Sequence, residues 1–286
     1  VEEFHKFLMN GDLYMGSKPV MWSVVEKTAL AEAEVEYLEH ASPTIWVSFP
    51  ILNGDKELSD ASILIWTTTP WTIPANRAIA FSSQFEYGLF EVSSIEEGSI
   101  ASVGKKIIIN TAMQDNVEKA AKIKLNLLKP LKSLEGLICS HPFKESGYNF
   151  DVPLLEGDFL TEDTGTGFVH IAPSHGQDDY ELAIKNGIKP PFILDDEGYY
   201  LDDVEIFAGK KVYNDDGSLG DATGAVISEL IKSDNLLGKG KLRHQYPHSW
   251  RSKSPLIFRN TPQWFISMET NELRKKSLKA IEDVKW

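Results

Sequence analysis

The chain has 286 residues, of which 42% are hydrophobic and 25% are charged, a composition typical of a folded globular protein. No apolar run approaches the roughly eighteen residues that a membrane-spanning helix needs, so we expect no membrane partner. The N-terminus lacks the basic and then apolar layout of a signal peptide, and it starts at Val rather than Met, so we expect an excised piece of a longer protein.

The chain contains one cysteine, Cys139, which excludes an internal disulfide and a zinc site built from cysteines. This cysteine usage fits a reducing compartment, and we predict a cytoplasmic location. Because Cys139 follows the apolar residues Leu137 and Ile138, we predict a buried structural side chain rather than a nucleophile.

The net charge of −13 is distributed unevenly. Residues 151–235 contain 19 acidic and 5 basic residues, whereas residues 236–268 contain 6 basic residues and no acidic one. Histidines and aromatic residues lie among these basic residues, and such a strip can follow a phosphate backbone. The alternative is a solvated face and linker that contacts the acidic part of the same chain. The acidic bulk predicts that any nucleic-acid contacts are local.

The first half of the chain predicts a short helix followed by many strands. Residues 1–15 have apolar side chains at helical spacing and end at Asn10-Gly11. Residues 20–24 and 33–37 predict a pair of strands, a two-stranded ribbon suited to a stalk. Further strands are expected at residues 44–52, 62–68, 78–81, 87–92 and 107–110, and a helix at residues 115–124.

The second half mixes strands with helices. Strands are expected at residues 150–155 and 167–172, and helices within residues 174–187, 222–231 and 271–281. Short strands with frequent turns favour an α+β fold with a β-barrel-like or sandwich-like core and peripheral helices.

Residues 66–80 read WTTTPWTIPANRAIA and follow the apolar run of residues 63–66, which predicts a strand. Pro70 and Pro74 cannot donate to a sheet, so the strand ends there and an ordered loop begins. Thr67, Thr68 and Thr69 therefore lie where a strand opens into a loop, with hydroxyl groups able to bind a polar ligand. The alternative is a strand end capped by its own hydroxyl bonds.

Residues 165–180 read GTGFVHIAPSHGQDDY. The glycines precede a strand and no Lys-Ser/Thr follows, which excludes a phosphate-binding loop. The spacing of His170, His175 and Asp179 matches no common zinc pattern, so we predict no metal site.

Together, the two stretches resemble the editing domain of class I aminoacyl-tRNA synthetases, specifically of the isoleucyl type. Residues 18–37 and 246–268 resemble the segments that tie this insertion to the synthetase body. Thr69 and His170 favour the isoleucyl type, because the valyl and leucyl types read TTRP and the valyl type carries lysine at the position of His170. The resemblance implies three segments: residues 1–40 as helix and strand-ribbon linker, residues 41–235 as editing domain, and residues 236–286 as basic return linker and C-terminal helix.

The resemblance also implies a function, the hydrolysis of misacylated Val-tRNA(Ile) and of valyl-adenylate, with isoleucine excluded by size. Isoleucine and valine differ by one methylene, worth about 1–3 kcal/mol, and this enzyme family is the standard illustration of that limit. The implied partners are the acceptor end of tRNA(Ile) carrying valine and the rest of the synthetase in cis. Editing needs no cofactor, and ATP would serve a synthetic domain whose HIGH and KMSKS signatures this chain lacks.

The resemblance assigns roles to eight residues. Asp179 matches the essential aspartate that would bind the aminoacyl α-ammonium, although a plain helix cap is the alternative. Thr72 and His170 match positions that shape the side-chain pocket. The residues expected to act in hydrolysis are Asp179, Thr67 and Thr68, and those expected to bind substrate are Trp66, Thr69, Thr72, Asn76 and His170.

Two other hypotheses remain open from the sequence. The chain could hold the tRNA acceptor end yet need the missing body for hydrolysis. It could also be a free-standing metal-dependent hydrolase, which chelation would inactivate. Ser249 and Ser252 stand where family members often carry cysteines, which argues against a metal there.

Overall fold

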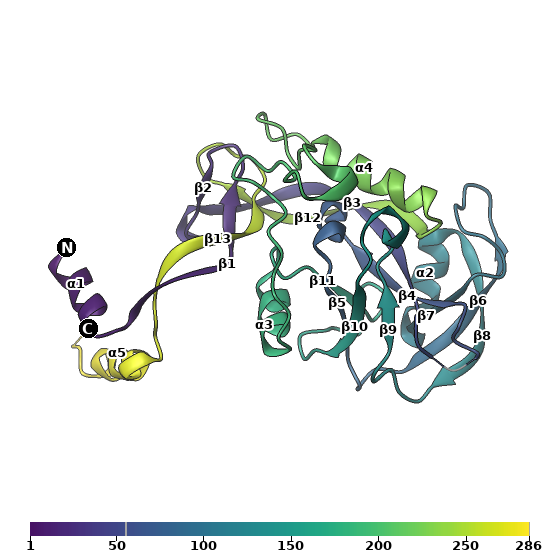
Figure 1. Cartoon of the computed structure of the whole chain (residues 1–286), viewed down its shortest axis with the longest axis horizontal. Helices are drawn as coiled ribbons and strands as arrows, with labels where there is room; N and C mark the ends of the chain where they lie inside the picture. Colours follow the sequence, from purple (N-terminus) through teal and green to yellow (C-terminus); the bar gives the residue numbers. More distant parts are fainter. Residues whose placement is uncertain (55, 286) are drawn as a thin grey trace. The chain divides into compact units, whose positions relative to one another are not determined.

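The computed structural model describes residues 1–54 and 56–285. The chain divides into two compact units, each described by itself below. The terminal unit comprises Val1–Lys18 and Asn260–Trp286, and the main unit comprises Pro19–Arg259. Figure 1 shows the elements in chain order.

The terminal unit contains two helices, α1 (Glu2–Met9) and α5 (Leu273–Glu282), which confirms the helices predicted at both ends. Helix α1 ends as expected at Asn10-Gly11, where Gly11 has a positive φ of 77°. The side-chain amide of Asn271 donates to the carbonyl oxygen of Asn10 at 3.1 Å and thereby ties the segment before α5 to the end of α1.

The main unit is built on a six-stranded sheet with the order β12-β3-β4-β7-β6-β8. Strands β4 and β7 are parallel, and the other neighbours are antiparallel. In this order the strands are Leu236–Ser249, Val35–Pro50, Ala61–Thr67, Lys106–Asn110, Tyr87–Ile95 and Ile123–Leu131.

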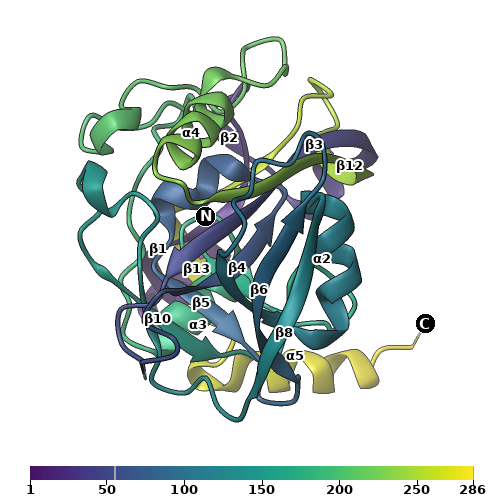
Figure 2. The same ribbon diagram turned by 90° about the vertical axis from the view of Figure 1, so that its right-hand side faces the viewer.

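Both faces of this sheet are covered. Helix α2 (Gln114–Ala121) lies against one face of the sheet (Figure 2). Its residues Val117 and Ala121 belong to the same buried cluster as Leu64 and Phe90 of the sheet. The opposite face carries the larger core.

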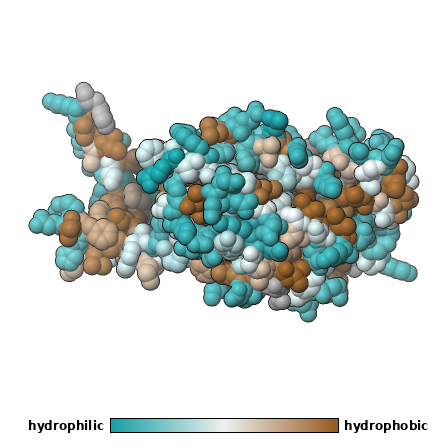
Figure 3. All heavy atoms as spheres, turned by 90° about the horizontal axis from the view of Figure 1, so that it is seen from above, coloured by the Kyte–Doolittle hydropathy of each residue, from teal (hydrophilic) through white to brown (hydrophobic). Residues whose placement is uncertain are grey.

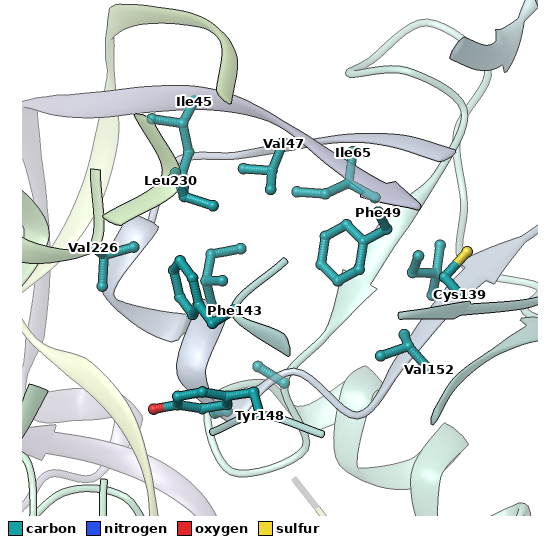
Figure 4. Packing of buried hydrophobic residues seen from close by; sticks show 14 of the residues in the cluster. Ile45, Val47, Phe49, Ile65, Cys139, Phe143, Tyr148, Val152, Val226 and Leu230 are labelled. Carbon is teal, nitrogen blue, oxygen red and sulfur yellow. The ribbon is translucent and has the colours of Figure 1, made fainter. Parts of the chain in front are cut away.

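In this larger core, Ile45, Val47 and Phe49 alternate along β3 and point to the same side, together with Ile65 of β4 (Figure 4). Helix α4 (Asp221–Lys232) adds Val226 and Leu230 to it.

A four-stranded sheet with the order β11-β5-β10-β9 lies against this larger core. In this order the strands are Val169–Ile171, Ala78–Phe81, Asp151–Glu156 and Ile138–Ser140, and helix α3 (Gln177–Lys185) follows β11. Cys139 on β9 is fully buried, and burial raises the pKa of its thiol far above the ordinary value. The predicted burial of Cys139 is confirmed.

A three-stranded sheet has the order β13-β1-β2, formed by Ile257–Ile266, Leu13–Ser23 and Thr28–Ala29. The turn between β1 and β2 is bonded to the turn after β12 through Glu26. One carboxylate oxygen of Glu26 accepts from the Ser249 hydroxyl at 2.6 Å and from the Ser252 backbone amide at 3.1 Å. Hydrogen bonds therefore join these turns.

Short 3-10 helices connect several of these strands and helices. They are η1 Glu32–Glu34, η2 Pro70–Ala75, η3 Thr111–Met113, η4 Lys144–Ser146, η5 Glu205–Phe207 and η6 Thr270–Glu272.

The predicted α+β class is confirmed, and the described sheets are open rather than closed into a barrel. The predicted pairing of residues 20–24 with 33–37 is wrong. Trp22 and Ser23 pair instead with Ala29 and Thr28, while β3 starts at Val35 and pairs with β12 from Val35 to Val47. Alternation marks a strand but not its partner, and β12 lies in a segment predicted as linker.

On the face shown in Figure 3, hydrophobic and hydrophilic areas alternate. Across residues 1–54 and 56–285, the helices are too short and polar to cross a membrane.

Candidate functional site

The first motif forms a strand end followed by a tight helical turn. Strand β4 ends at Thr67, and the segment predicted as an ordered loop is the 3-10 helix η2, all of whose residues are buried. Pro70 suits the first helical position because its missing N–H needs no partner there. Asn76 ends the turn and is fully buried. The chain therefore places Thr67, Thr72 and Asn76 within a few residues on a rigid element.

Three threonines form a continuous chain of hydroxyl contacts. The hydroxyl oxygens of Thr67 and Thr69 are 3.2 Å apart, and those of Thr69 and Thr72 are 3.3 Å apart. The Thr72 hydroxyl donates to the backbone oxygen of Thr69 at 2.8 Å. The strand end is therefore capped by its own hydroxyl bonds, as in the alternative to ligand binding given above. The Thr69 hydroxyl, which lies near both neighbours, can still change partners.

His170 joins this chain from strand β11. The amide nitrogen of Asn76 donates to the Ala78 carbonyl at 2.9 Å, which orients the amide, and lies 3.3 Å from Nδ1 of His170. Nδ1 therefore accepts, and Nε2 carries the proton and donates to the Thr72 hydroxyl at 2.9 Å. Burial, aided by the nearby His175, lowers the pKa of His170 to about 4, so the imidazole is neutral at physiological pH.

Asp179 lies in the first turn of α3, but its carboxylate does not simply cap that helix. One oxygen accepts from the backbone amide of Ala172 at 2.7 Å, two residues beyond His170. Burial raises the pKa of Asp179 to about 7, with a further contribution from Asp178, although the Ala172 amide acts in the opposite direction. A Cβ atom on Gly176 would lie 2.9 Å from the carboxyl carbon, so glycine is required for this close approach.

Two buried polar atoms near these residues have no hydrogen-bond partner within the described part of the chain. They are Oδ1 of Asn76 and Nε2 of His175. His175 donates from Nδ1 to the Phe258 carbonyl at 2.8 Å, so its Nε2 is an acceptor, and burial lowers its pKa to about 4. Both atoms can accept from a water molecule or a hydroxyl group.

Two further residues that contact or border this site, Arg77 and His175, are not among the site residues predicted from the sequence. Arg77 donates to the backbone oxygen of Asn76 at 2.5 Å and stacks over Phe150 at 4.5 Å, which holds the end of η2. His175 was considered as a metal ligand and not as an acceptor. Their positions inside the two motifs are the signal that could have identified them.

The predicted residues do not all belong to one network. Thr67, Thr69, Thr72, Asn76 and His170 are linked by the contacts above. Thr68 is half-buried beside them, and its side chain makes no hydrogen bond to the residues that the structure describes.

Trp66 precedes Thr67 on β4 and thus points to the opposite face of the sheet, where its ring lies 6.3 Å from that of Trp46. Among residues 1–54 and 56–285, no group of three His, Cys, Asp or Glu side chains could hold a metal ion.

Comparison with known proteins identifies the family. The model of "tRNA synthetases class I (I, L, M and V)" matches residues 1–286. The chain belongs to the class I tRNA synthetases. This synthetase chain is 48% identical over 301 residues to an isoleucine–tRNA ligase of Caulobacter vibrioides, which covers 99% of the chain and 31% of that relative. It is 48% identical over 292 residues to an isoleucine–tRNA ligase of Pelagibacter ubique, which covers 100% of the chain and 31% of that relative.

The synthetase chain thus spans about a third of the length of these relatives. The resemblance to class I synthetases of the isoleucyl type is confirmed by these matches. A solved structure named "The crystal structure of GlLeuRS-CP1" matches with a TM-score of 0.47 and 14% identity, over 68% of this chain and 97% of that chain.

Proposed function

We propose that this chain is an editing module that hydrolyses the ester of Val-tRNA(Ile) and excludes isoleucine by size. The observation that carries the proposal is the chain of contacts from Thr67 through Thr69 and Thr72 to His170, with the Asp179 carboxylate bound two residues further on. Membership of the class I family and similarity to isoleucine–tRNA ligases support it.

Asp179 would bind the α-ammonium group of the aminoacyl ester. Its second carboxylate oxygen is not used by the Ala172 amide and can accept from a cation. A bound ammonium favours the charged carboxylate, so binding would lower the pKa of Asp179 from about 7 and complete its ionisation. Charge pairing in this partly buried position would hold the ester carbonyl in one orientation.

Hydrolysis itself requires a positioned water and a stabilised oxyanion, because an ester is already activated. The water oxygen adds to the carbonyl carbon, the bond from that carbon to the ribose oxygen breaks, and a water proton is transferred to the ribose oxygen. The products are valine and a tRNA with a free terminal hydroxyl. The Thr67, Thr68 and Thr69 hydroxyls would hold the water and the ribose oxygens, and the unpartnered Oδ1 of Asn76 offers another acceptor.

His170 and Thr72 would form the wall that excludes isoleucine. Two contacts at 2.9 and 3.3 Å hold the imidazole, so the wall cannot yield without breaking buried hydrogen bonds. Overpacking a rigid wall by one methylene costs about 1–3 kcal/mol. Valyl-adenylate, whose valyl group is the same, would enter the same pocket.

The proposal includes partners outside this chain. The acceptor end of tRNA(Ile) would deliver the ester, and the rest of the synthetase would act in cis, joined through residues 1–40 and 236–286 around the editing segment 41–235. Editing would use no cofactor, and ATP would be used by the synthetic domain alone.

Deacylation of Val-tRNA(Ile) and Ile-tRNA(Ile) tests the proposal. The chain, with a chelator present, is expected to release valine and not isoleucine, and Asp179→Ala is expected to release neither. Retained tRNA binding without any hydrolysis would favour a binding module that needs the rest of the synthetase. Loss of valine release on chelation would instead favour a metal-dependent hydrolase.

A further inference from the structure

The 3-10 helix η2, which carries Thr72, needs support from outside itself. Helices of this kind rarely extend beyond about three or four residues because their hydrogen-bond geometry is poor, whereas η2 has six. Two of the six, Pro70 and Pro74, have no N–H to donate. All six residues are buried, so water cannot bond the backbone oxygens at the end of the helix. Donors from other parts of the chain are therefore required.

Tyr200 supplies the first of these donors. Its hydroxyl donates to the backbone oxygen of Trp71, and its ring centroid lies 5.9 Å from that of Phe207. The Tyr200 side chain is buried, and burial raises the pKa of the phenol well above its ordinary value. The hydroxyl therefore stays protonated and remains a donor across the physiological pH range.

His141, which follows strand β9, supplies the second donor. The backbone amide of Phe143 donates to Nδ1 of His141 at 3.1 Å, so Nε2 carries the proton and donates to the backbone oxygen of Ile73 at 3.0 Å. The same oxygen accepts from the Asn76 backbone amide at 3.0 Å, so both of its lone pairs are used. Burial lowers the pKa of His141 to about 3, although its bond to Ile73 acts in the opposite direction, so the ring remains neutral.

The two held carbonyls lie on either side of Thr72. The Trp71 carbonyl belongs to the peptide group that leads into Thr72, and the Ile73 carbonyl belongs to the next peptide group but one. The backbone at Thr72 is therefore fixed from both directions by buried side chains. Its hydroxyl accepts from Nε2 of His170 at 2.9 Å, a contact that a small rotation of η2 would break.

We propose that Tyr200 and His141 are positioning residues of this site: by holding the carbonyls on either side of Thr72, they fix its hydroxyl against the His170 imidazole and so set the size of the pocket. Loss of either bond would remove a buried hydrogen bond and let η2 shift. The exclusion of isoleucine then depends on two side chains that lie outside both sequence motifs. The role rests on the proposed function, because the wall formed by Thr72 and His170 selects between amino acids only in an editing pocket.

Deacylation by the chain tests the proposal through the ratio of kcat/KM for Val-tRNA(Ile) to that for Ile-tRNA(Ile). Tyr200→Phe removes only a hydroxyl group, and His141→Leu removes the ring nitrogens. Each change is expected to lower this ratio about tenfold, chiefly by raising the isoleucine value, since one methylene in a pocket is worth about 10–200-fold. His141→Gln, whose amide can still donate to Ile73, should keep most of the parent's ratio. Equal ratios for His141→Gln and His141→Leu would exclude the hydrogen bond as the cause.

Val117→Ala is the matched control for stability. Val117 is fully buried in the cluster under α2, whereas Trp71 and Ile73 of η2 belong to the larger core on the other face of the sheet. The variant should unfold at a lower temperature and discriminate like the parent chain. An equal loss of discrimination in Val117→Ala and Tyr200→Phe would overturn the inference, because general loosening of the fold would then explain both.

A readout that needs no hydrolysis separates this inference from the proposed function. The Nε2 proton of His170 is observable by proton–nitrogen NMR, and its resonance should shift in Tyr200→Phe and His141→Leu but not in Val117→Ala. If these shifts occur and the parent chain releases no valine, the positioning of Thr72 stands and the proposed function fails. If the parent chain discriminates, and both folded variants keep its ratio and its resonance, the inference is overturned and the proposed function stands.

Discussion

Replacing Asp179 by asparagine is expected to stabilise the fold at neutral and alkaline pH while abolishing hydrolysis. Burial raises the pKa of this carboxyl from its ordinary value near 3.8 to about 7. A raised carboxyl pKa stabilises the fold fully below pH 3.8, and that stabilisation is lost as the pH rises to about 7. The interval corresponds to at most about 4 kcal/mol, because one pH unit is worth about 1.4 kcal/mol.

Urea unfolding of the parent chain and Asp179→Asn at several pH values between 4 and 8 measures this effect. The asparagine oxygen can still accept from the Ala172 amide, so the two chains should have similar stability near pH 4. The variant should become the more stable one by about 1–4 kcal/mol at pH 8. Asp178→Asn, an exposed change on the same helix, is the control and should alter the pH dependence only slightly. Parallel stability profiles for the parent chain and Asp179→Asn would refute the reasoning.

Three further changes test other parts of the structure. His170→Ala should open the pocket wall, so that the deacylation rate of Ile-tRNA(Ile) comes within about tenfold of that of Val-tRNA(Ile). The same change should lower the unfolding free energy by about 1–3 kcal/mol. Unchanged selectivity in a folded variant would contradict the proposed role of His170 in excluding isoleucine. Gly176→Ala should displace the Asp179 carboxylate, because the added Cβ would lie 2.9 Å from the carboxyl carbon. The variant should release valine more slowly, with little change in its thermal unfolding temperature. Full activity would show that the position of the carboxylate is unimportant. Burial alone would raise the pKa of Glu26, but hydrogen bonds from Ser249 and Ser252 leave that pKa below its ordinary value. The parent chain should therefore be more stable than Glu26→Gln above pH 4.5, and this difference should shrink as the pH falls. A difference that grows on acidification would exclude this account.

Local pattern predicted most strands of the main unit but not how they pair. The β-branched run at residues 63–66 is a strand wherever its neighbours lie, and β4 confirms it. The alternation at residues 33–37 is equally clear, yet only Val35 onwards belongs to a strand, because its partner β12 comes from far along the chain. Residues 123–131 and 138–140 were missed as strands, since no sequence motif marks them.

The site shows a similar division. The resemblance placed Thr72, Asn76 and His170 together, and their side chains are in contact. Which nitrogen of His170 carries the proton depends on the Ala78 carbonyl, which orients the Asn76 amide, and no sequence pattern encodes that contact. The raised pKa of Asp179 likewise depends on burial by surrounding elements, which spacing along α3 cannot supply.

The pairing of β3 with β12 has a consequence for synthesis on the ribosome. Ser42 and His244, which meet across this pair, are 202 residues apart, and translation at about 5–20 residues per second needs about 10–40 seconds to cover that distance. Throughout that time, one edge of a strand bearing Ile45, Val47 and Phe49 has no partner, and such an edge invites association with other nascent chains. The edge of β3 that pairs with β12 is therefore open to such association until residues 236–249 have been synthesised.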